Sequence, residues 1–205
     1  MISLIVPAHN EEFELSSTLA AIHLAASSAA QQYEIVVVDD ASTDATPEIA
    51  AQAGAKVVRI NRRQIAAARN AGARAGLGEY LFFVDADTRI SASHVTQAIA
   101  ALEAGYAGGS ARVAIDGVIP PWGRVLLRVF TVLYFGLNLG AGAFLFTKVL
   151  REPIVTSGRK LRMYPAKQFL CNFLRVVVAG PRGARSRAKL RLWYDGKREK
   201  RAAEA

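Results

Sequence analysis

Short apolar runs alternate with longer mixed segments along the first 115 residues of this 205-residue chain. The apolar runs predict strands, because a continuous β-branched run such as "YEIVVVDD" is typical of a strand covered on both faces. The segments between them predict helices, since they combine Ser, Thr or Asp at the start with Ala-rich stretches and terminal glycines. The predicted strands are 2–8, 33–40, 55–60, 79–87 and 106–115, and the predicted helices are 11–30, 42–54, 62–78 and 91–105. This alternation predicts an α/β fold with a mostly parallel sheet flanked by helices.

After Gly117 the pattern changes to a long apolar stretch. Residues 129–147 contain no charged side chain and approach the length of a membrane span. Glycines interrupt this run and lower its helix propensity, so we predict an amphipathic helix at about 124–137 and a buried strand at 142–148. A membrane-spanning helix is the alternative. A strand at 151–158, an apolar-faced helix at 164–180 and a basic end complete the prediction.

The net charge of +9 is concentrated in the last quarter of the chain. Residues 1–150 hold 11 Lys and Arg against 13 Asp and Glu, whereas residues 151–205 hold 15 against 4. Such a basic tail favours polyanions, such as anionic lipid headgroups, phosphorylated substrates or nucleic acid, although a solvated helix or frayed end has the same composition. Nucleic acid is not expected, because Trp193 and Tyr194 are the only aromatic residues after Gly180.

The cysteine and histidine content limits the kinds of site that the chain can form, and the N-terminal residues indicate its location. The single Cys171 excludes an internal disulfide framework and a Cys-based zinc cluster, and three scattered histidines argue against a histidine-rich metal site. The start "MISLIVPAHNEE" has neither a basic leader nor a small-residue cleavage site, so a cytoplasmic location is expected.

Polar residues collect where the predicted strands end, which is where open parallel sheets bind ligands. The turn "PAHNEE" lacks the glycines that cradle a pyrophosphate in dinucleotide-binding loops. Asp85 and Asp87 form an acid–x–acid (DXD) pair after an apolar strand, and residues i and i+2 lie on the same side of a strand. Such a pair can hold Mg²⁺ or Mn²⁺ together with substrate phosphate oxygens and water. A merely polar strand end is the alternative.

The stretches "SLIVPAHNEE", "YEIVVVDDASTDAT" and "AAARNAGARAGLGEYLFFVDADTRIS" together resemble family 2 glycosyltransferases, which have the Rossmann-like GT-A fold. The resemblance covers about residues 2–115. It implies a nucleotide-diphospho-sugar donor, linked to UDP or GDP, and a divalent metal that bridges its diphosphate. By resemblance, the metal ligands are Asp85 and Asp87, and the donor-binding residues are Pro7, Ala8, His9, Asp39, Asp40, Arg69 and Asp85. From the residues alone, Asp39 can also be a strand terminator, Arg69 a solvated helix cation and His9 a loop residue that lines the site.

The second half departs from the family pattern at one place. Relatives carry a stretch like "GGFDE" and then a Glu-Asp pair, one acid of which is the general base, whereas Lys148 is followed here by Val, Leu and Arg. No catalytic base is assigned. Asp116 and Glu152 are candidates that nothing in the sequence singles out.

The resemblance therefore implies an enzyme of hexosyltransferase type that inverts the anomeric configuration of the transferred sugar. The basic tail and the apolar segment suggest a lipid or polyprenyl phosphate acceptor and peripheral contact with the cytoplasmic membrane face. The alternative is a catalytically impaired donor-binding or scaffold protein without the base. A nucleotidyltransferase would need a basic, glycine-rich loop near the N-terminus to bind a triphosphate, and the turn "PAHNEE" is not such a loop. We expect a donor-binding half at 1–115, a truncated acceptor-side half at 116–165 and a basic helical tail at 166–205.

Overall fold

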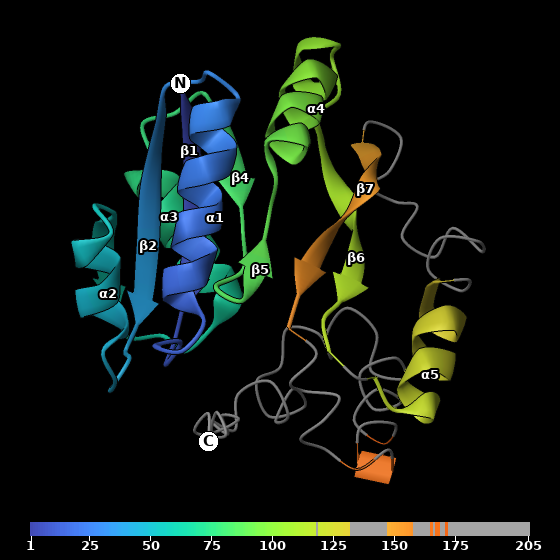
Figure 1. The fold of residues 1–205 in the computed structure, drawn as a ribbon. Coiled ribbons are helices and arrows are strands. Elements are labelled where there is room, and N and C mark those ends of the chain that lie inside the picture. Colours follow the sequence, from blue (N-terminus) through green and yellow to red (C-terminus); the bar gives the residue numbers. More distant parts are fainter. Residues whose placement is uncertain (118, 132–146, 158–164, 166, 169–170, 172–205) are drawn as a thin grey trace. The chain divides into compact units, whose positions relative to one another are not determined.

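The computed structural model describes residues 1–117, 119–131, 147–157, 165, 167–168 and 171. Strands and helices alternate from Ile2 to Phe83, as the sequence pattern predicts, and a short strand, Thr88–Arg89, then precedes the next helix (Figure 1). The strands are β1 (Ile2–Ala8), β2 (Tyr33–Asp40), β3 (Lys56–Ile60), β4 (Tyr80–Phe83), β5 (Thr88–Arg89), β6 (Gly108–Ile115) and β7 (Thr147–Thr156). The helices are α1 (Leu15–Ser28), α2 (Thr46–Gln52), α3 (Ile65–Ala75), α4 (Ala92–Glu103) and α5 (Pro121–Thr131).

Four parallel strands form the main sheet, in the order β3-β2-β1-β4. The chain moves outward from β1 to β2 and β3, and then returns to place β4 on the other side of β1. The order of strands therefore reverses between β1 and β4, and ligands bind at such a switch point, outside the carboxyl ends of the strands. The predicted α/β class is confirmed.

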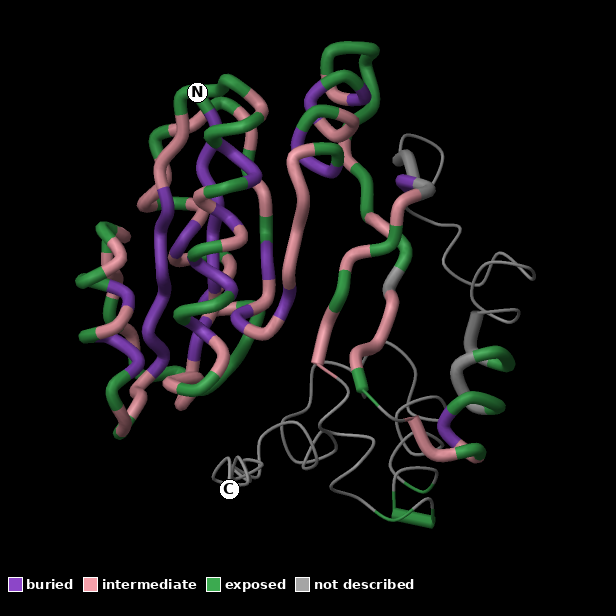
Figure 2. The backbone as a smooth tube through the Cα atoms, viewed as in Figure 1, coloured by how far each residue is buried: buried purple, intermediate pink, exposed green. Residues whose placement is uncertain are grey.

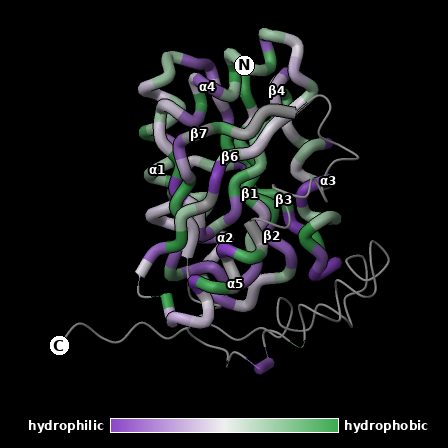
Figure 3. The backbone as a smooth tube through the Cα atoms, turned by 90° about the vertical axis from the view of Figure 1, so that its right-hand side faces the viewer, coloured by the Kyte–Doolittle hydropathy of each residue, from purple (hydrophilic) through white to green (hydrophobic). Residues whose placement is uncertain are grey.

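Helices cover both faces of this sheet. Alternate residues of β1, Ile2, Leu4 and Val6, pack with α1 and with Ala50 of α2 in one buried cluster. Ile5 of β1 packs in a second cluster on the opposite face, with residues of β2 and α3. Figure 2 shows the buried residues along β1 and β2, and Figure 3 shows that hydrophobic residues run along β1. The central strands are hydrophobic throughout because both of their faces are covered.

Two glycines have clear structural reasons. Gly54 follows α2 with a φ of 75°, which L side chains rarely adopt, so it ends the helix as the sequence predicts. Gly72 lies where α3 contacts the sheet, and a Cβ there would overlap the Cγ2 atom of Ile5 and lie 3.0 Å from the Cγ2 atom of Val38. This glycine therefore lets α3 approach β1 and β2 closely.

The later strands differ from the prediction in two ways. The predicted strand 79–87 is shorter, because β4 ends at Phe83 and a turn follows. The predicted strand 106–115 does form β6, but it belongs to a separate three-stranded sheet of order β5-β7-β6. In this sheet β5 pairs antiparallel with β7, so Thr88 faces Thr156.

The chain divides into two units, Met1–Ala114 with Ala143–Thr156, and Ile115–Gly142 with Ser157–Ala205. The second unit contributes α5, which begins three residues before the predicted amphipathic helix. The end of that helix, most of the predicted strand 142–148, most of the predicted helix 164–180 and the basic end lie outside the described residues. In the part that is described, no helix is long and apolar enough to span a membrane.

Candidate functional site

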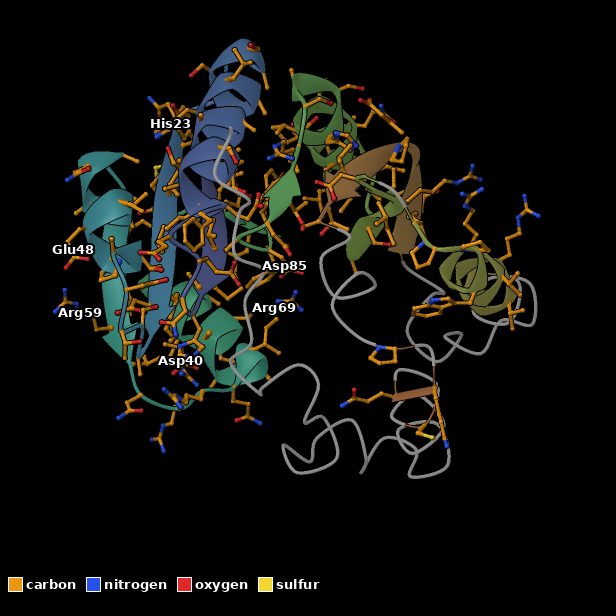
Figure 4. All side chains as sticks on the ribbon, turned by 60° about the horizontal axis from the view of Figure 1, so that its bottom comes forward. His23, Asp40, Glu48, Arg59, Arg69 and Asp85 are labelled. Carbon is orange, nitrogen blue, oxygen red and sulfur yellow. The ribbon has the colours of Figure 1, made fainter. Side chains whose placement is uncertain are left out.

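The predicted site residues lie where β1, β2 and β4 end. Pro7 and Ala8 are the last residues of β1, and Ala8 pairs in register with Asp39 at the end of β2. His9 follows as a half-buried loop residue. Asp40, Arg69 and Asp85 lie toward the same edge of the sheet, with His23 toward the far one (Figure 4).

Arg69 and Asp85 form the central ion pair of this edge. Nη2 of Arg69, on α3, donates to Oδ1 of Asp85, which follows β4, over 2.7 Å. Both side chains keep about half of their surface in solvent, with exposed fractions of 40% and 48%. Nε of Arg69 is buried, and the described residues provide no acceptor for it. The pair is therefore a solvent-accessible group of opposite charges at the switch point, and its buried Nε–H donor has no acceptor within the described part of the chain.

Asp85 and Asp87 lie on a turn, so the prediction that they extend a strand is wrong. The N–H of Thr88 donates to the carbonyl oxygen of Asp85 over 2.9 Å, which closes the turn. Ala86 between them is buried, and its carbonyl oxygen accepts the hydroxyl of Thr18 over 2.8 Å. The two carboxylates thus flank a residue whose main chain is fixed to α1.

Asp87 has a further partner that the sequence does not suggest. The hydroxyl of Thr156, at the end of β7, donates to Oδ1 of Asp87 over 3.3 Å, and Thr88 donates to the same hydroxyl over 3.2 Å. Thr156 lies 69 residues after Asp87, and no local motif links them. The three-stranded sheet therefore contributes to the surroundings of the acid pair.

The two adjacent acids of β2 have different surroundings. Both side chains are buried. Asp39 accepts the N–H of Ser42 over 3.0 Å at Oδ1, which holds the loop that follows β2. Asp40 accepts three main-chain N–H groups, from Arg62 and Arg63 at Oδ1 and from Gln64 at Oδ2, over 2.6–2.7 Å. Both oxygens of Asp40 are therefore engaged by the segment that enters α3.

A set of hydrogen bonds joins the loop after β1 to the loop after β2, and we call it the loop clasp. Its members are Asn10, Glu11, Glu12, Ser42, Thr43, Asp44, Ala45 and Thr46. Oδ1 of Asn10, for example, accepts the N–H of Thr43 over 2.8 Å, while the hydroxyl of Thr46 accepts the N–H of Glu11 over 2.8 Å. The polar residues of "ASTDAT" are a turn signal, but their partners could not be known from sequence. The glutamates of "PAHNEE" thus contribute to loop structure.

Backbone conformations at this edge are unusual. Asn10 after β1, Ala41 after β2 and Arg63 after β3 have φ values of 53°, 59° and 47°. Left-handed backbone is costly for residues other than glycine, and it persists where surrounding contacts enforce it, often at functional sites. Here the loop clasp and the carboxylates of β2 supply those contacts.

The acid pair fits a divalent cation that a substrate helps to bind. Among the described residues, no group of three or more His, Cys, Asp or Glu side chains is arranged to hold a metal. Mg²⁺ and Mn²⁺ need no such cage where one or two carboxylates combine with phosphate oxygens and water. Asp85 and Asp87 supply two hard oxygen donors of this kind, next to the guanidinium of Arg69.

Glu152 has surroundings that do not suit a general base. Its carboxylate accepts the hydroxyl of Ser91 over 2.9 Å, and its carbonyl oxygen lies 3.2 Å from Nε2 of the buried His94. Hydrogen bonds from the Ser93 and Ser91 side chains hold the pKa of Glu152 below its ordinary value, whereas a general base works best with a pKa near the working pH. Glu152 is also four residues from Thr156 along β7, or about 13 Å of extended chain. Through its bonds to Ser91 and His94, Glu152 instead holds β7 against the start of α4.

Comparison with known proteins assigns a family to most of the chain. The model of the family described as "Glycosyl transferase family 2" matches residues 3–157. An uncharacterized glycosyltransferase of Mycobacterium tuberculosis is 33% identical over 134 residues, which are 64% of this chain and 56% of the relative. An undecaprenyl-phosphate 4-deoxy-4-formamido-L-arabinose transferase of Aeromonas hydrophila is 30% identical over 114 residues, 52% of this chain and 35% of the relative. The chain thus spans between about a third and about half of the length of these relatives.

Solved structures give the same fold. Glucosyl-3-phosphoglycerate synthase from Mycobacterium tuberculosis, in complex with Mn²⁺, UDP and glucosyl-3-phosphoglycerate, superposes with a TM-score of 0.50 at 26% identity. This match covers 71% of the present chain and 53% of the synthase. S. aureus TarS 1–349 in complex with UDP-GlcNAc gives a TM-score of 0.55 at 20% identity, over 77% of this chain and 58% of TarS. The expected GT-A fold is confirmed.

Proposed function

The chain belongs to glycosyl transferase family 2, and we propose that it transfers a sugar from a nucleoside-diphosphate sugar to an acceptor. The acceptor oxygen attacks the anomeric carbon, the bond from that carbon to the diphosphate oxygen breaks, and the nucleoside diphosphate leaves with the bonding electrons. Attack from the side opposite the leaving group inverts the sugar configuration. A hydroxyl acceptor releases its proton to a side-chain base or to water in the same reaction, whereas a phosphate acceptor attacks through an oxygen that is already ionised.

The contact between Arg69 and Asp85 is the observation that carries this proposal. It brings a guanidinium to a carboxylate at the switch point of the sheet, where a phosphorylated ligand is expected. A departing diphosphate gains negative charge, and a positioned guanidinium stabilises that charge. The Nε donor of Arg69, which has no acceptor among the described residues, is consistent with an anionic partner. The glucosyl-3-phosphoglycerate synthase, which shares this fold, was solved with UDP bound, and this supports a nucleoside diphosphate as the ligand.

Each further group of the site receives one role in the proposal. Pro7, Ala8, His9 and Asp39, at the ends of β1 and β2, would contact the nucleoside. Asp85 and Asp87 would hold Mg²⁺ or Mn²⁺ against the diphosphate. When bound, the cation neutralises charge that develops on the leaving group. The synthase neighbour was solved with Mn²⁺, which supports this part of the proposal.

A lipid phosphate at a membrane surface is the acceptor that we favour. The Aeromonas relative is named for undecaprenyl phosphate. On α5, Val125 and Val129 have exposed fractions of 62% and 47%, one turn apart, while Arg124 and Arg128 are also exposed. An amphipathic helix with basic residues beside its apolar face binds anionic lipid surfaces. We therefore infer peripheral contact of α5 with the membrane.

A second candidate is donor binding without efficient transfer. The absence of the family's base stretch after Lys148 favours it, and Glu152 is engaged elsewhere. General-base assistance typically contributes about 10²–10⁴-fold to a rate. A protein that binds the donor but transfers the sugar slowly to every acceptor tested would match this alternative.

Calorimetric titration tests the proposal directly. UDP, GDP and their glucose and N-acetylglucosamine conjugates are titrated into the protein in excess Mn²⁺, and again with EDTA. We expect one nucleotide series to bind with Mn²⁺ and to bind more weakly with EDTA. Absence of binding by either series in both conditions would refute donor recognition. Binding followed by turnover with polyprenyl phosphate then separates the two candidate functions.

A further inference from the structure

Asp40 holds the start of α3 and does so with its whole carboxylate. Its side chain is 4% exposed, and it accepts the N–H groups of Arg62, Arg63 and Gln64 over 2.6–2.7 Å. Gln64 is the residue immediately before α3, with extended backbone and no side-chain cap of its own. The carboxylate of Asp40 therefore anchors the segment that enters α3, and one of its three donors is the N–H of Gln64, the N-cap residue of the helix.

The same helix carries Arg69 to Asp85. Arg69 lies five residues after Gln64, or about 7.5 Å along the helix axis. Farther along α3, the close approach of Gly72 to Ile5 and Val38 fixes the helix against β1 and β2. With Asp40 at its start and Gly72 in its second half, α3 has little freedom to slide along the sheet. The main-chain position from which Arg69 reaches Asp85 follows from these two contacts.

We propose that Asp40 is a positioning residue, which acts through α3 and Arg69 on the diphosphate end of the donor, in place of the nucleoside contact that the sequence resemblance implies. The inference rests on the proposed function, because it concerns the same donor site. Asp40 stands on β2 and Asp85 follows β4, on opposite sides of β1, about 10 Å apart by two strand spacings. Its effect on the diphosphate must therefore pass through α3.

Binding of Mn²⁺-pyrophosphate separates a positioning role from a nucleoside contact, since pyrophosphate has no base or ribose. We expect Asp40→Asn to weaken binding of Mn²⁺-pyrophosphate and of the preferred nucleoside diphosphate by the same factor, about tenfold, because a small displacement of a binding group has large effects. Asp39→Asn is the matched neighbour and should weaken binding of the preferred nucleoside diphosphate without changing the affinity for Mn²⁺-pyrophosphate. An unchanged pyrophosphate affinity in Asp40→Asn would overturn the inference.

A double-mutant cycle tests whether the effect passes through Arg69. In an Arg69→Ala background, Asp40→Asn should cause no further loss of Mn²⁺-pyrophosphate affinity, because coupled residues are not additive. Full additivity would show that Asp40 acts by another route. Wild-type protein that binds neither pyrophosphate nor nucleotide would refute the proposed function, and this inference with it.

A variant at the other end of β2 controls for general destabilisation. Glu34→Gln alters another carboxylate of β2 that accepts a main-chain N–H, from Leu77, at the opposite edge of the sheet. It should lower the unfolding temperature and leave pyrophosphate affinity unchanged. If Asp40→Asn does not fold, Asp40→Glu, which keeps the charge but displaces the carboxylate, is measured with the same expectations.

Discussion

Arg69 and Asp85 are 16 residues apart in the chain, and Nη2 of the arginine donates to Oδ1 of the aspartate over 2.7 Å. One residue comes from a helix and the other from the turn after β4, so the contact depends on how α3 packs against the sheet. We expect Arg69→Lys to weaken binding of the preferred nucleoside diphosphate about tenfold, since lysine lacks the planar fork of donors. Calorimetric titration measures this loss.

The stability of the same variant provides its control. The ion pair is half exposed, and such pairs contribute about 0–1 kcal/mol. Arg69→Lys should therefore change the free energy of unfolding, measured in urea, by no more than about 1 kcal/mol. A larger loss of stability with unchanged nucleotide affinity would mean that the pair is structural only.

Asp87 should determine the metal dependence of donor binding. In Asp87→Asn, we expect Mn²⁺ to stop improving the affinity for the nucleoside diphosphate, because an amide oxygen is a weaker ligand for a hard cation than a carboxylate. The affinity in EDTA should stay near that of the wild type. Titrations with and without Mn²⁺ measure both values. Glu48→Gln, an exposed acid on α2, makes the same change in charge and should retain the Mn²⁺ effect.

Glu34 should make folding stability depend on acid pH. Burial raises its pKa, but hydrogen bonds from the N–H of Leu77 and the hydroxyl of Ser3, with the charge of Lys56, outweigh burial and hold the pKa below its ordinary 4.5. A carboxyl whose pKa is lower in the folded state contributes stability above pH 4.5, and this contribution is lost as the pH falls through the folded pKa.

Urea unfolding at pH 7 and at pH 3 tests this expectation. At pH 7, Glu34→Gln should be less stable than the wild type by about 1 kcal/mol, the usual scale of a hydrogen bond in a folded protein. At pH 3 the difference should shrink. An equal difference at both pH values would show that the charge of Glu34 does not matter.

Gly72→Ala tests the close packing of α3. The added Cβ would overlap Ile5, so we expect a loss of about 1–3 kcal/mol in the free energy of unfolding, in spite of the better helix propensity of alanine. Gly108→Ala is the control, because its added Cβ meets no atom of the described residues within 4 Å. Urea unfolding of both variants gives the comparison. Equal stability in the two would contradict the packing argument.

If α5 contacts the membrane, negative charges on its exposed apolar face should weaken lipid binding. Val125→Asp with Val129→Asp should weaken binding to vesicles of anionic phospholipid about tenfold or more, because burying a valine contributes about 1.5 kcal/mol. Vesicle sedimentation measures this binding. Leu24→Asp on α1, where the leucine is 71% exposed, is the control and should bind as the wild type does. Equal loss in both variants would point to a general effect of negative charge.

Local sequence predicted the strands of the main sheet, because β-branched runs and terminal glycines act over a few neighbouring residues. It also predicted that Asp85 and Asp87 lie at a strand end. It did not predict the turn between them, which depends on Thr88, or the contact of Asp87 with Thr156, which comes from a distant strand. The hydrogen bonds of Asp40 could not be predicted from the sequence either. Its partners are main-chain N–H groups, which every residue except proline has, so no residue type marks them.

The loop clasp has a consequence for transplanting specificity between relatives. Donors and acceptors of one loop find their partners in the other, as Asn10 does with Ser42 and Thr43. A chimaera that receives only the loop after β1 would lack matching partners in the loop after β2, and the left-handed backbone at Asn10 would lose its support. The two loops therefore form one exchangeable module, and a graft should move residues 9–12 and 41–46 together.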